Sequence, residues 1–425
     1  MNPIYQPGRA WSIALMLAVL NLVNFLDKIV IGMVAVPMRE ELSLSPVQFG
    51  VIGGAIFWLF AVAGIAGGFL ANRFPTRWLL LGMALLWSAV QLPMIYASSM
   101  VVIVIARVLL GVGEGPCAAV SFHACYKWFP NDKRNLPATV INLGASLGVL
   151  IAGVSFPLIT ARWGWRANFV VLGIIGVVWA LAWLLVGREG PLEGDEEITE
   201  VTSLSSGKHQ PYSRLLTDRT VLGAALMTFV SYWGLVVTLT WMTTYLQKGL
   251  SYDAVTSGRM FALVVLLGIP VTLGLSAGSQ RLMARGASSR KARVVLGGLA
   301  LVAAGGLFVV PTFLALTPLH RVLLIAVASG LSQVVFALAP ALVGEVVPSA
   351  QRASVLSIEI ALGTLGGILS PIVMGYFMEA AGTDVARGYE NGLALSGLLL
   401  VGGGLLVMLL IDPERSKRRL LHSQT

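Results

Sequence analysis

The sequence predicts an all-α membrane protein with twelve transmembrane helices in two pseudo-symmetric six-helix bundles. The 425-residue chain is 56% apolar and only 12% charged, and its mean hydropathy is +0.83. A soluble globular domain carries about twice that share of charged residues. Apolar segments of bilayer-spanning length recur along the chain, and one polar break separates the first six from the last six.

Each apolar segment has about the 20 residues that an α-helix needs to cross the hydrocarbon core, and the longer ones must tilt. The first six are expected at residues 11–36, 48–71, 78–97, 100–127, 136–161 and 167–187. The second six are expected at residues 219–246, 256–280, 293–315, 320–345, 353–380 and 390–411.

The only long polar break spans residues 188–218, which are acidic and lack an apolar period. Such a segment is typical of a linker between domains. We therefore predict an N-terminal six-helix bundle at residues 1–187 and a cytoplasmic linker at 188–218. A C-terminal bundle with a cytoplasmic tail follows at residues 219–425.

The two halves resemble each other weakly. Pro130–Arg134 has the pattern P-x-x-x-R before the fifth segment, and Pro348–Arg352 repeats it before the eleventh. The second loop of each half is also similar, at residues 68–77 and 275–286. Internal repeats with Gly- and Pro-rich helices are typical of carriers that alternate access to a site near the bilayer midplane. Chance similarity between Gly-rich helices is the alternative.

The formal net charge of +9 reflects membrane topology. Basic residues gather in the tails and alternate loops of one side, which the positive-inside rule places in the cytoplasm with both termini. Because the charges follow the loops, we expect no nucleic-acid partner. The sequence contains no N-x-S/T acceptor site for glycosylation, which favours a bacterial inner membrane. The opposite side carries only seven basic residues: Arg39, Arg162, Arg166, Lys248, Arg259, Arg321 and Arg387.

Two charges interrupt the fourth apolar segment. Arg107 and Glu114 are seven residues apart, so they share one face of a helix, roughly 10 Å apart. A charge at bilayer depth costs at least about 2.5 kcal/mol, and it normally faces a bundle interior or a water-filled cavity. Arg107 is a candidate internal ion-pair partner. An ion pair that only locks helices together is the alternative for both residues.

The first apolar segment carries a polar stripe. Asn21, Asn24, Asp27 and Lys28 lie on one side of a helix and should line a cavity. Burial favours the protonated form of a carboxyl group, whereas a nearby cation favours the ionised form, so Asp27 could exchange a proton. A fixed salt bridge between Asp27 and Lys28 or Arg107 is the alternative.

Candidate substrate contacts in the second half are fewer. Glu359 is the only acid well inside a C-terminal apolar segment, and an internal hydrogen bond is its alternative role. Tyr232 and Trp233 could wall a binding site, although aromatic residues also anchor spans at the membrane interface. Gln333 is a further candidate polar contact.

Five motifs in order give the chain a family resemblance. They are NFLDKIVIG at 24–32, the Phe57–Phe60 pair, GFLANRFPTR at 68–77, ARVLLGVGEGP followed by WFPNDKR, and WRANF at 165–169. The chain resembles the major facilitator superfamily and, within it, the anion:cation symporter family. Asn72 and Pro75 depart from the superfamily's loop motif, in which Gly68, Arg73 and Arg77 match gating positions.

The resemblance implies the major facilitator fold and proton-driven uptake of an organic anion. It assigns the substrate carboxylate to Lys28, proton coupling to Asp27 and Glu114, and a partner role to Arg107. We expect Asn24, Phe25 and Phe60 to contact the substrate as well. Lys28 replaces an arginine of the family, and Phe25 and Phe60 replace tyrosines whose hydroxyls look like sugar-acid ligands. These departures predict a small monocarboxylate with an apolar body.

Other functions are less compatible with the sequence. A proton-coupled antiporter that exports a drug-like compound is the alternative transporter. The chain shows no Ser/His/Asp set, metal-ligand cluster or P-loop, so we expect no enzyme activity, cofactor or metal. A channel usually carries charged rings or carbonyl filters, and a sensor would bind a ligand without flux. The expected partners are the organic anion, protons and the lipid bilayer, with the chain as a monomer.

Overall fold

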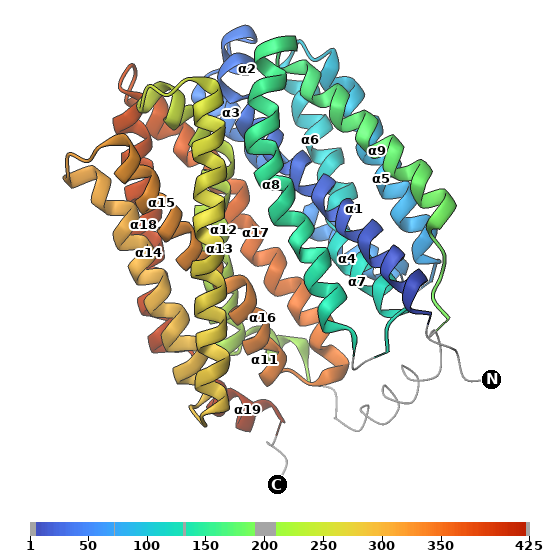
Figure 1. Ribbon diagram of the computed structural model, residues 1–425. Coiled ribbons are helices and arrows are strands. Elements are labelled where there is room, and N and C mark those ends of the chain that lie inside the picture. The colour runs from blue at the N-terminus through green and yellow to red at the C-terminus, as the bar shows by residue number, and fades with distance from the viewer. Residues whose placement is uncertain (1–5, 72, 131–132, 192–209, 422–425) are drawn as a thin grey trace. The chain divides into compact units, whose positions relative to one another are not determined.

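The protein is helical throughout the regular structure of its described residues, 6–71, 73–130, 133–191 and 210–421 of a computed structural model (Figure 1). Within these residues, twelve stretches of helix are long and apolar enough to cross a membrane. Each overlaps one of the twelve segments expected from the sequence. The predicted all-α class and number of spans are therefore confirmed.

The first six spans comprise eight helices, because the second and fourth spans are interrupted. A short helix, α2 (Ala35–Glu41), follows the first span. The spans are α1 (Pro7–Met33), α3 (Pro46–Ala55) with α4 (Phe60–Ala71), α5 (Thr76–Ile95), α6 (Met100–Glu114) with α7 (Cys117–Tyr126), α8 (Asn135–Trp163) and α9 (Arg166–Val186).

The second six spans include two π-helical turns and one interruption. Two short helices, α11 (Tyr212–Leu216) and α19 (Pro413–Leu421), flank them. The spans are α12 (Arg219–Thr244) with η2 (Tyr245–Gly249), α13 (Ala254–Ala284), η3 (Arg290–Val295) with α14 (Leu296–Phe313), α15 (Pro318–Gln333) with α16 (Val335–Val346), α17 (Ser349–Ala380) and α18 (Val385–Leu410).

Internal contacts divide the chain into two compact units. Unit 1 comprises Met1–Leu44, Val51–Glu200 and Ala254–Ala262. Unit 2 comprises Ser45–Gly50, Val201–Asp253 and Leu263–Thr425. The predicted boundaries at 187 and 219 stay a prediction, and residues 192–209 of the predicted linker lie outside the described residues.

Local sequence signals set several helix ends. The Asp218 side chain accepts a hydrogen bond from the backbone N–H of Thr220 at the start of α12, and Asp384 accepts one from that of Arg387 at the start of α18. Such caps satisfy backbone donors that have no partner within the helix. The α8 helix ends at Trp163, and the next residue, Gly164, has a φ of +81°, a conformation that glycine adopts without a steric penalty.

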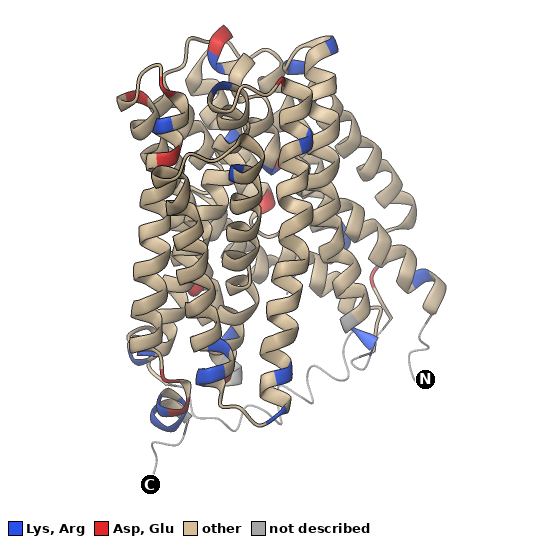
Figure 2. Ribbon diagram, turned by 60° about the vertical axis from the view of Figure 1, so that its left-hand side comes forward, with Lys and Arg blue, Asp and Glu red and all other residues tan. Residues whose placement is uncertain are grey.

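Charged residues gather toward the ends of the helices in each unit, and few lie midway along them (Figure 2). This distribution is the one that a hydrocarbon environment imposes, because a charge in lipid has no water to solvate it. The exceptions inside the spans of the described residues include four in unit 1, at Asp27, Lys28, Arg107 and Glu114, and Glu359 in unit 2. These exceptions need partners inside their unit.

Glycines let helices of unit 1 approach each other closely. The α1 and α8 helices pack side by side (Figure 1). A Cβ atom on Gly144 would lie 2.1 Å from the carbonyl oxygen of Ala18, and one on Gly148 would lie 2.4 Å from that of Leu22. Neither distance is sterically possible, so α8 can lie against α1 only where its side chains are absent. Small residues serve this purpose in membrane helix packing generally.

Gly148→Ala should therefore destabilise the protein by about 1–3 kcal/mol, because the added methyl forces α8 away from α1. Gly82→Ala is the matched control: Gly82 also lies within a helix, but a Cβ atom added there would meet no atom within 4 Å. Both substitutions gain the same helix propensity. Thermal unfolding in detergent should show a lower midpoint for Gly148→Ala only, and equal midpoints would contradict the close approach.

Candidate functional site

Lys28 lies at the centre of a buried polar group in unit 1. Its Nζ donates a hydrogen bond to Asn24 Oδ1 at 2.5 Å and lies 3.5 Å from Glu114 Oε2. The Glu114 side chain is fully buried, whereas that of Lys28 keeps 14% of its surface exposed. We call Asp27, Lys28, Arg107 and Glu114 the unit 1 charge cluster. Two acids and two bases make it formally neutral.

Two aromatic rings flank the Lys28 ammonium. Its Nζ lies 4.5 Å from the ring centroid of Phe25 and 5.3 Å from that of Phe60. Phe57 packs against Phe60 with 5.8 Å between the ring centroids. A cation within about 6 Å of an aromatic face is attracted by the ring quadrupole. Phe25 and Phe60 therefore hold the ammonium in place without competing for its hydrogen bonds.

Asp27 faces a different set of partners. Its Oδ1 accepts a hydrogen bond from Gln91 Nε2 at 2.9 Å. Arg107 donates from a terminal nitrogen of its guanidinium to the backbone carbonyl oxygen of Asp27 at 3.0 Å. The sequence predicts an internal ion pair for Arg107, but the contact in the structure is to a carbonyl oxygen. No described carboxylate lies within ion-pair distance of Arg107.

The interruption of the fourth span places Glu114 at the cluster. The α6 helix ends at Glu114, directly before Gly115 and Pro116, and proline cannot continue the hydrogen bonding of α6. A Cβ atom on Gly111 would lie 1.9 Å from the carbonyl oxygen of Ile56, and one on Gly115 would lie 2.1 Å from that of Phe60. These glycines admit the backbone between α3 and α4, and that approach brings the Phe60 ring to Lys28.

The four candidates of the second half lie in unit 2. Glu359 is 1% exposed, and its Oε1 accepts a hydrogen bond from Thr228, whereas Oε2 has no partner among the described residues. Tyr232 packs edge-on against Phe336 at 5.0 Å, and Trp233 donates from its indole N–H to Ser396 Oγ at 3.1 Å. Gln333 is half-buried at the end of α15. Glu359 and Thr228 thus form a direct pair, whereas Trp233 is committed to Ser396.

The three predicted gating positions differ in their contacts: Gly68 and Arg73 lie in open surroundings, whereas Arg77 forms a hydrogen bond to another helix. A Cβ on Gly68 would meet no atom within 4 Å, and Arg73 is exposed in the turn after α4. Arg77 donates from its guanidinium to the Leu184 carbonyl oxygen at 2.9 Å. Asn72 lies outside the described residues. Arg77 therefore links the start of α5 to the end of α9.

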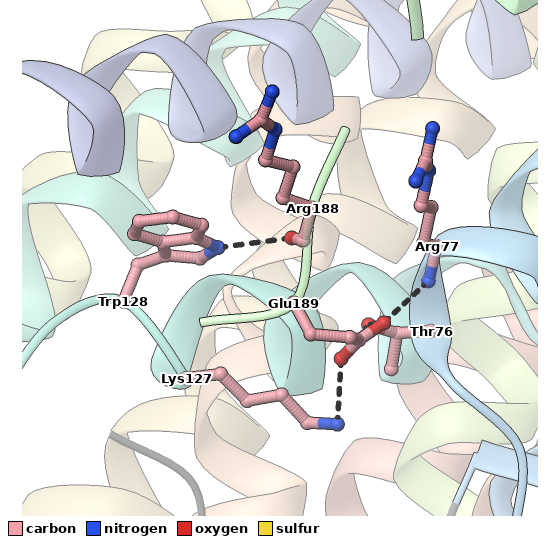
Figure 3. Close-up of polar contacts among 6 residues, drawn as sticks. All are labelled: Thr76, Arg77, Lys127, Trp128, Arg188 and Glu189. Atoms are coloured by element: carbon pink, nitrogen blue, oxygen red, sulfur yellow. Dashed lines mark hydrogen bonds and ion pairs between the residues drawn. The ribbon is translucent and has the colours of Figure 1, made fainter. Parts of the chain in front are cut away.

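Glu189, which is not among the predicted site residues, joins three segments of unit 1: its own, the start of α5 and the end of α7. Its carboxylate accepts hydrogen bonds from the Arg77 backbone N–H at 2.8 Å, from Lys127 Nζ at 2.9 Å and from the Thr76 hydroxyl at 3.0 Å (Figure 3). The indole of Trp128 donates to the Arg188 carbonyl oxygen at 3.2 Å. A carboxylate at the first turn of α5 also interacts favourably with the helix dipole.

Hydrogen bonds control the ionisation of Glu189. Burial opposes the charge, but the hydrogen bonds from the Arg77 backbone, Lys127 and Thr76 outweigh it and hold the pKa of Glu189 below its usual value of 4.5. Nothing in the sequence distinguishes Glu189, because it is one of several acids in a polar break. Gln91 could have been found, because it is a polar residue inside an apolar segment.

Comparison with known proteins identifies the family. The family model described as "Major Facilitator Superfamily" matches residues 17–324. The chain belongs to the major facilitator superfamily. A solved structure of the bacterial homolog of the human lysosomal transporter Spinster shares this major facilitator protein's fold, with a TM-score of 0.77. It is 18% identical in sequence, and the match covers 98% of this chain and 99% of the other.

Two curated relatives of this major facilitator protein match nearly their whole length. The hexuronate transporter of Bacillus subtilis is 27% identical over 410 residues, which cover 94% of each chain. The probable sulfoacetate transporter SauU of Cupriavidus necator is 26% identical over 407 residues, 92% of this chain and 91% of the relative. Both names describe carriers of organic anions.

Glu189 should make stability depend on pH in a defined direction. Because its pKa is lower in the folded state, the unfolded chain binds more protons at acid pH, and stability rises with pH through this range. The contribution is present above pH 4.5 and is lost as the pH falls through the folded pKa. Glu189→Gln should lower the free energy of unfolding at pH 7 by about 1–3 kcal/mol, and with it the unfolding midpoint. The difference in midpoint between Glu189→Gln and the parent should shrink below pH 4.5.

The measurement is thermal unfolding of both proteins in detergent between pH 7 and pH 4. Glu379→Gln, which changes an exposed carboxylate at the end of α17, is the control and should follow the parent. A deficit that stays constant over the whole pH range would show that ionised Glu189 is not the stabilising species.

Proposed function

We propose that the protein is a secondary transporter that couples the uptake of a small organic anion to protons. The observation that carries the proposal is the Lys28 ammonium, which is held by Asn24 and flanked by Phe25 and Phe60. A largely covered cation inside a membrane span can recognise a carboxylate through charge-assisted hydrogen bonds. Membership of the major facilitator superfamily and the anion-transporter names of its relatives support transport rather than enzymatic turnover.

Charge balance suggests how anion and proton are coupled. Lys28 lies 3.5 Å from Glu114, so an arriving carboxylate competes with Glu114 for the same ammonium. A neutral cluster that gains an anion acquires a net negative charge, which is unfavourable in a buried site. A proton on Glu114 or Asp27 removes that charge. Substrate and proton would therefore bind together, which is the condition for symport.

The remaining roles follow the same proposal. Arg107 would orient Asp27 through the carbonyl contact, and Glu359 would use its free Oε2 toward a donor group on the substrate. We propose a monomer in a bacterial inner membrane with both termini in the cytoplasm. Further proposed substrate contacts are Tyr232, Trp233 and Gln333, and the proposed gating positions are Gly68, Arg73 and Arg77.

The substrate class follows from what surrounds Lys28. Phe25 and Phe60 offer apolar faces and no hydroxyl, so a polyhydroxylated anion would leave hydrogen bonds unmade at about 1–3 kcal/mol each. An apolar or aromatic body would instead pack on the rings. We therefore propose a monocarboxylate with a substantial apolar part, in contrast to the sugar acid in the name of the Bacillus subtilis relative.

Asp27→Asn and Glu114→Gln should each abolish accumulation of a transported anion driven by an inward proton gradient in proteoliposomes. Each mutant lacks a carboxyl group that binds and releases the coupled proton. Counterflow, which needs no net proton movement, should survive in at least one of them. Glu379→Gln is the control and should accumulate normally.

Full gradient-driven uptake by both mutants would overturn the assignment of the coupling residues. Proton-driven efflux by the parent protein would instead favour the antiporter.

Lys28→Ala should weaken anion binding about 10–100-fold, because a charge-assisted hydrogen bond is worth about 1.5–3 kcal/mol. Lys28→Arg keeps the charge and should retain part of the binding.

Competition for uptake should rank benzoate-like and short branched acids above gluconate, galactonate and glucarate. Phe60→Tyr is the matched variant: the added hydroxyl should improve inhibition by the sugar acids. Tight inhibition of the parent by sugar acids alone would contradict the proposed class.

A further inference from the structure

Four arginines of unit 2 converge on one pocket of about 270 Å³. Arg219, Arg290, Arg415 and Arg419 line it, and all four are exposed. They come from the starts of α12 and η3 and from the terminal helix α19. We call this pocket the arginine pocket. Four guanidinium groups around one cavity repel each other, so this arrangement calls for an anion as occupant.

The acidic residues at the pocket are engaged elsewhere. Asp218 Oδ1 caps α12 by accepting a hydrogen bond from the Thr220 N–H, and Asp412 Oδ1 accepts one from the Arg415 N–H at 3.0 Å. Among the described residues, neither carboxylate forms an ion pair with a pocket arginine. The four arginines and two aspartates leave a formal charge of +2. Glu414, just outside the lining, accepts a hydrogen bond from the Arg290 backbone N–H at 3.4 Å, and counting it still leaves a net positive charge among these described residues.

The arginine pocket lies where three spans end. Arg219 begins one span, Arg290 begins another, and Leu410 ends a third. Leu409 and Leu410 also line the pocket and are 78% and 42% exposed. Exposed leucines at the end of a span face the hydrocarbon, whereas the arginines face the polar boundary. A ligand of this pocket meets both environments.

The pocket is built on fixed elements. The Thr220 and Ser416 hydroxyls form a hydrogen bond at 2.8 Å, which ties α19 to α12. Leu420 is 1% exposed, so α19 packs its apolar side inward. Arg415 and Arg419 are four residues apart and share the outward face. Their guanidinium groups are therefore presented together.

We propose that the arginine pocket binds the phosphate headgroup of an anionic phospholipid, with its acyl chains along Leu409 and Leu410. Arginine pairs with phosphate through two parallel hydrogen bonds, and basic pockets between spans are suited to anionic headgroups. Four arginines suit a lipid that carries two phosphates, such as cardiolipin. The distribution of basic residues predicts that this end faces the cytoplasm, so the lipid belongs to the cytoplasmic leaflet.

The test is thermal unfolding of the full-length protein in detergent with added cardiolipin or phosphatidylcholine, since a ligand of the folded state raises the unfolding midpoint. Cardiolipin should raise the midpoint above that in phosphatidylcholine. The double variant Arg219→Gln/Arg415→Gln should lose at least half of this rise. These two side chains have no hydrogen-bond or ion-pair partner in the described part of the chain, so their removal should leave the fold intact.

Arg281→Gln/Arg285→Gln is the matched control, because it removes two exposed arginines near the end of α13 and outside the pocket. It should keep the whole cardiolipin effect. An equal loss in both double variants, or no cardiolipin effect in the parent, would overturn the proposal. An equal rise with inorganic pyrophosphate would assign the pocket to a soluble anion instead. If Arg219→Gln/Arg415→Gln already melts lower in phosphatidylcholine, native mass spectrometry replaces the thermal test and compares the cardiolipin retained by Arg415→Gln and by the parent. Less cardiolipin on Arg415→Gln supports the proposal, and equal amounts overturn it.

Discussion

Four charges inside the spans, three of them buried and one largely covered, are the constraint on which the rest of unit 1 depends. Asp27, Lys28, Arg107 and Glu114 lie within spans, where each isolated charge would cost several kcal/mol. They are tolerated because each contacts another polar group: Lys28 contacts Asn24 and Glu114, and Asp27 contacts Gln91. These contacts join α1, α5 and α6, so the three helices must pack closely around the cluster.

Close packing requires backbones without side chains at the crossings. Gly144 and Gly148 let α8 lie against α1, and Gly111 and Gly115 let the break between α3 and α4 lie against α6. The breaks in the second and fourth spans serve the same site, because they place Phe60 and Glu114 beside Lys28. A buried polar site in a membrane bundle thus depends on glycines, which have no side chain and let the helices approach each other.

The ends of the spans follow a different rule, since water replaces lipid there. In unit 1, Glu189 gathers donors from α5 and from the end of α7, and its lowered pKa reflects those hydrogen bonds. In unit 2, the arginine pocket gathers cations whose neighbouring aspartates cap helices. The basic residue Lys127 is paired with Glu189, whereas the arginine pocket keeps a net positive charge that an external anion can neutralise.

The sequence by itself determined the fold class, the twelve spans and the candidate charges, because hydropathy and the cost of burying a charge depend on residue type alone. It could not assign partners. Arg107 contacts the carbonyl oxygen of Asp27 rather than a carboxylate, and Gln91 and Glu189 gain their roles from residues 62 or more positions away. Those pairings depend on which helix faces cross, and only the tertiary structure decides that. The arginine pocket likewise brings together residues between 218 and 419, which no spacing in the sequence indicates.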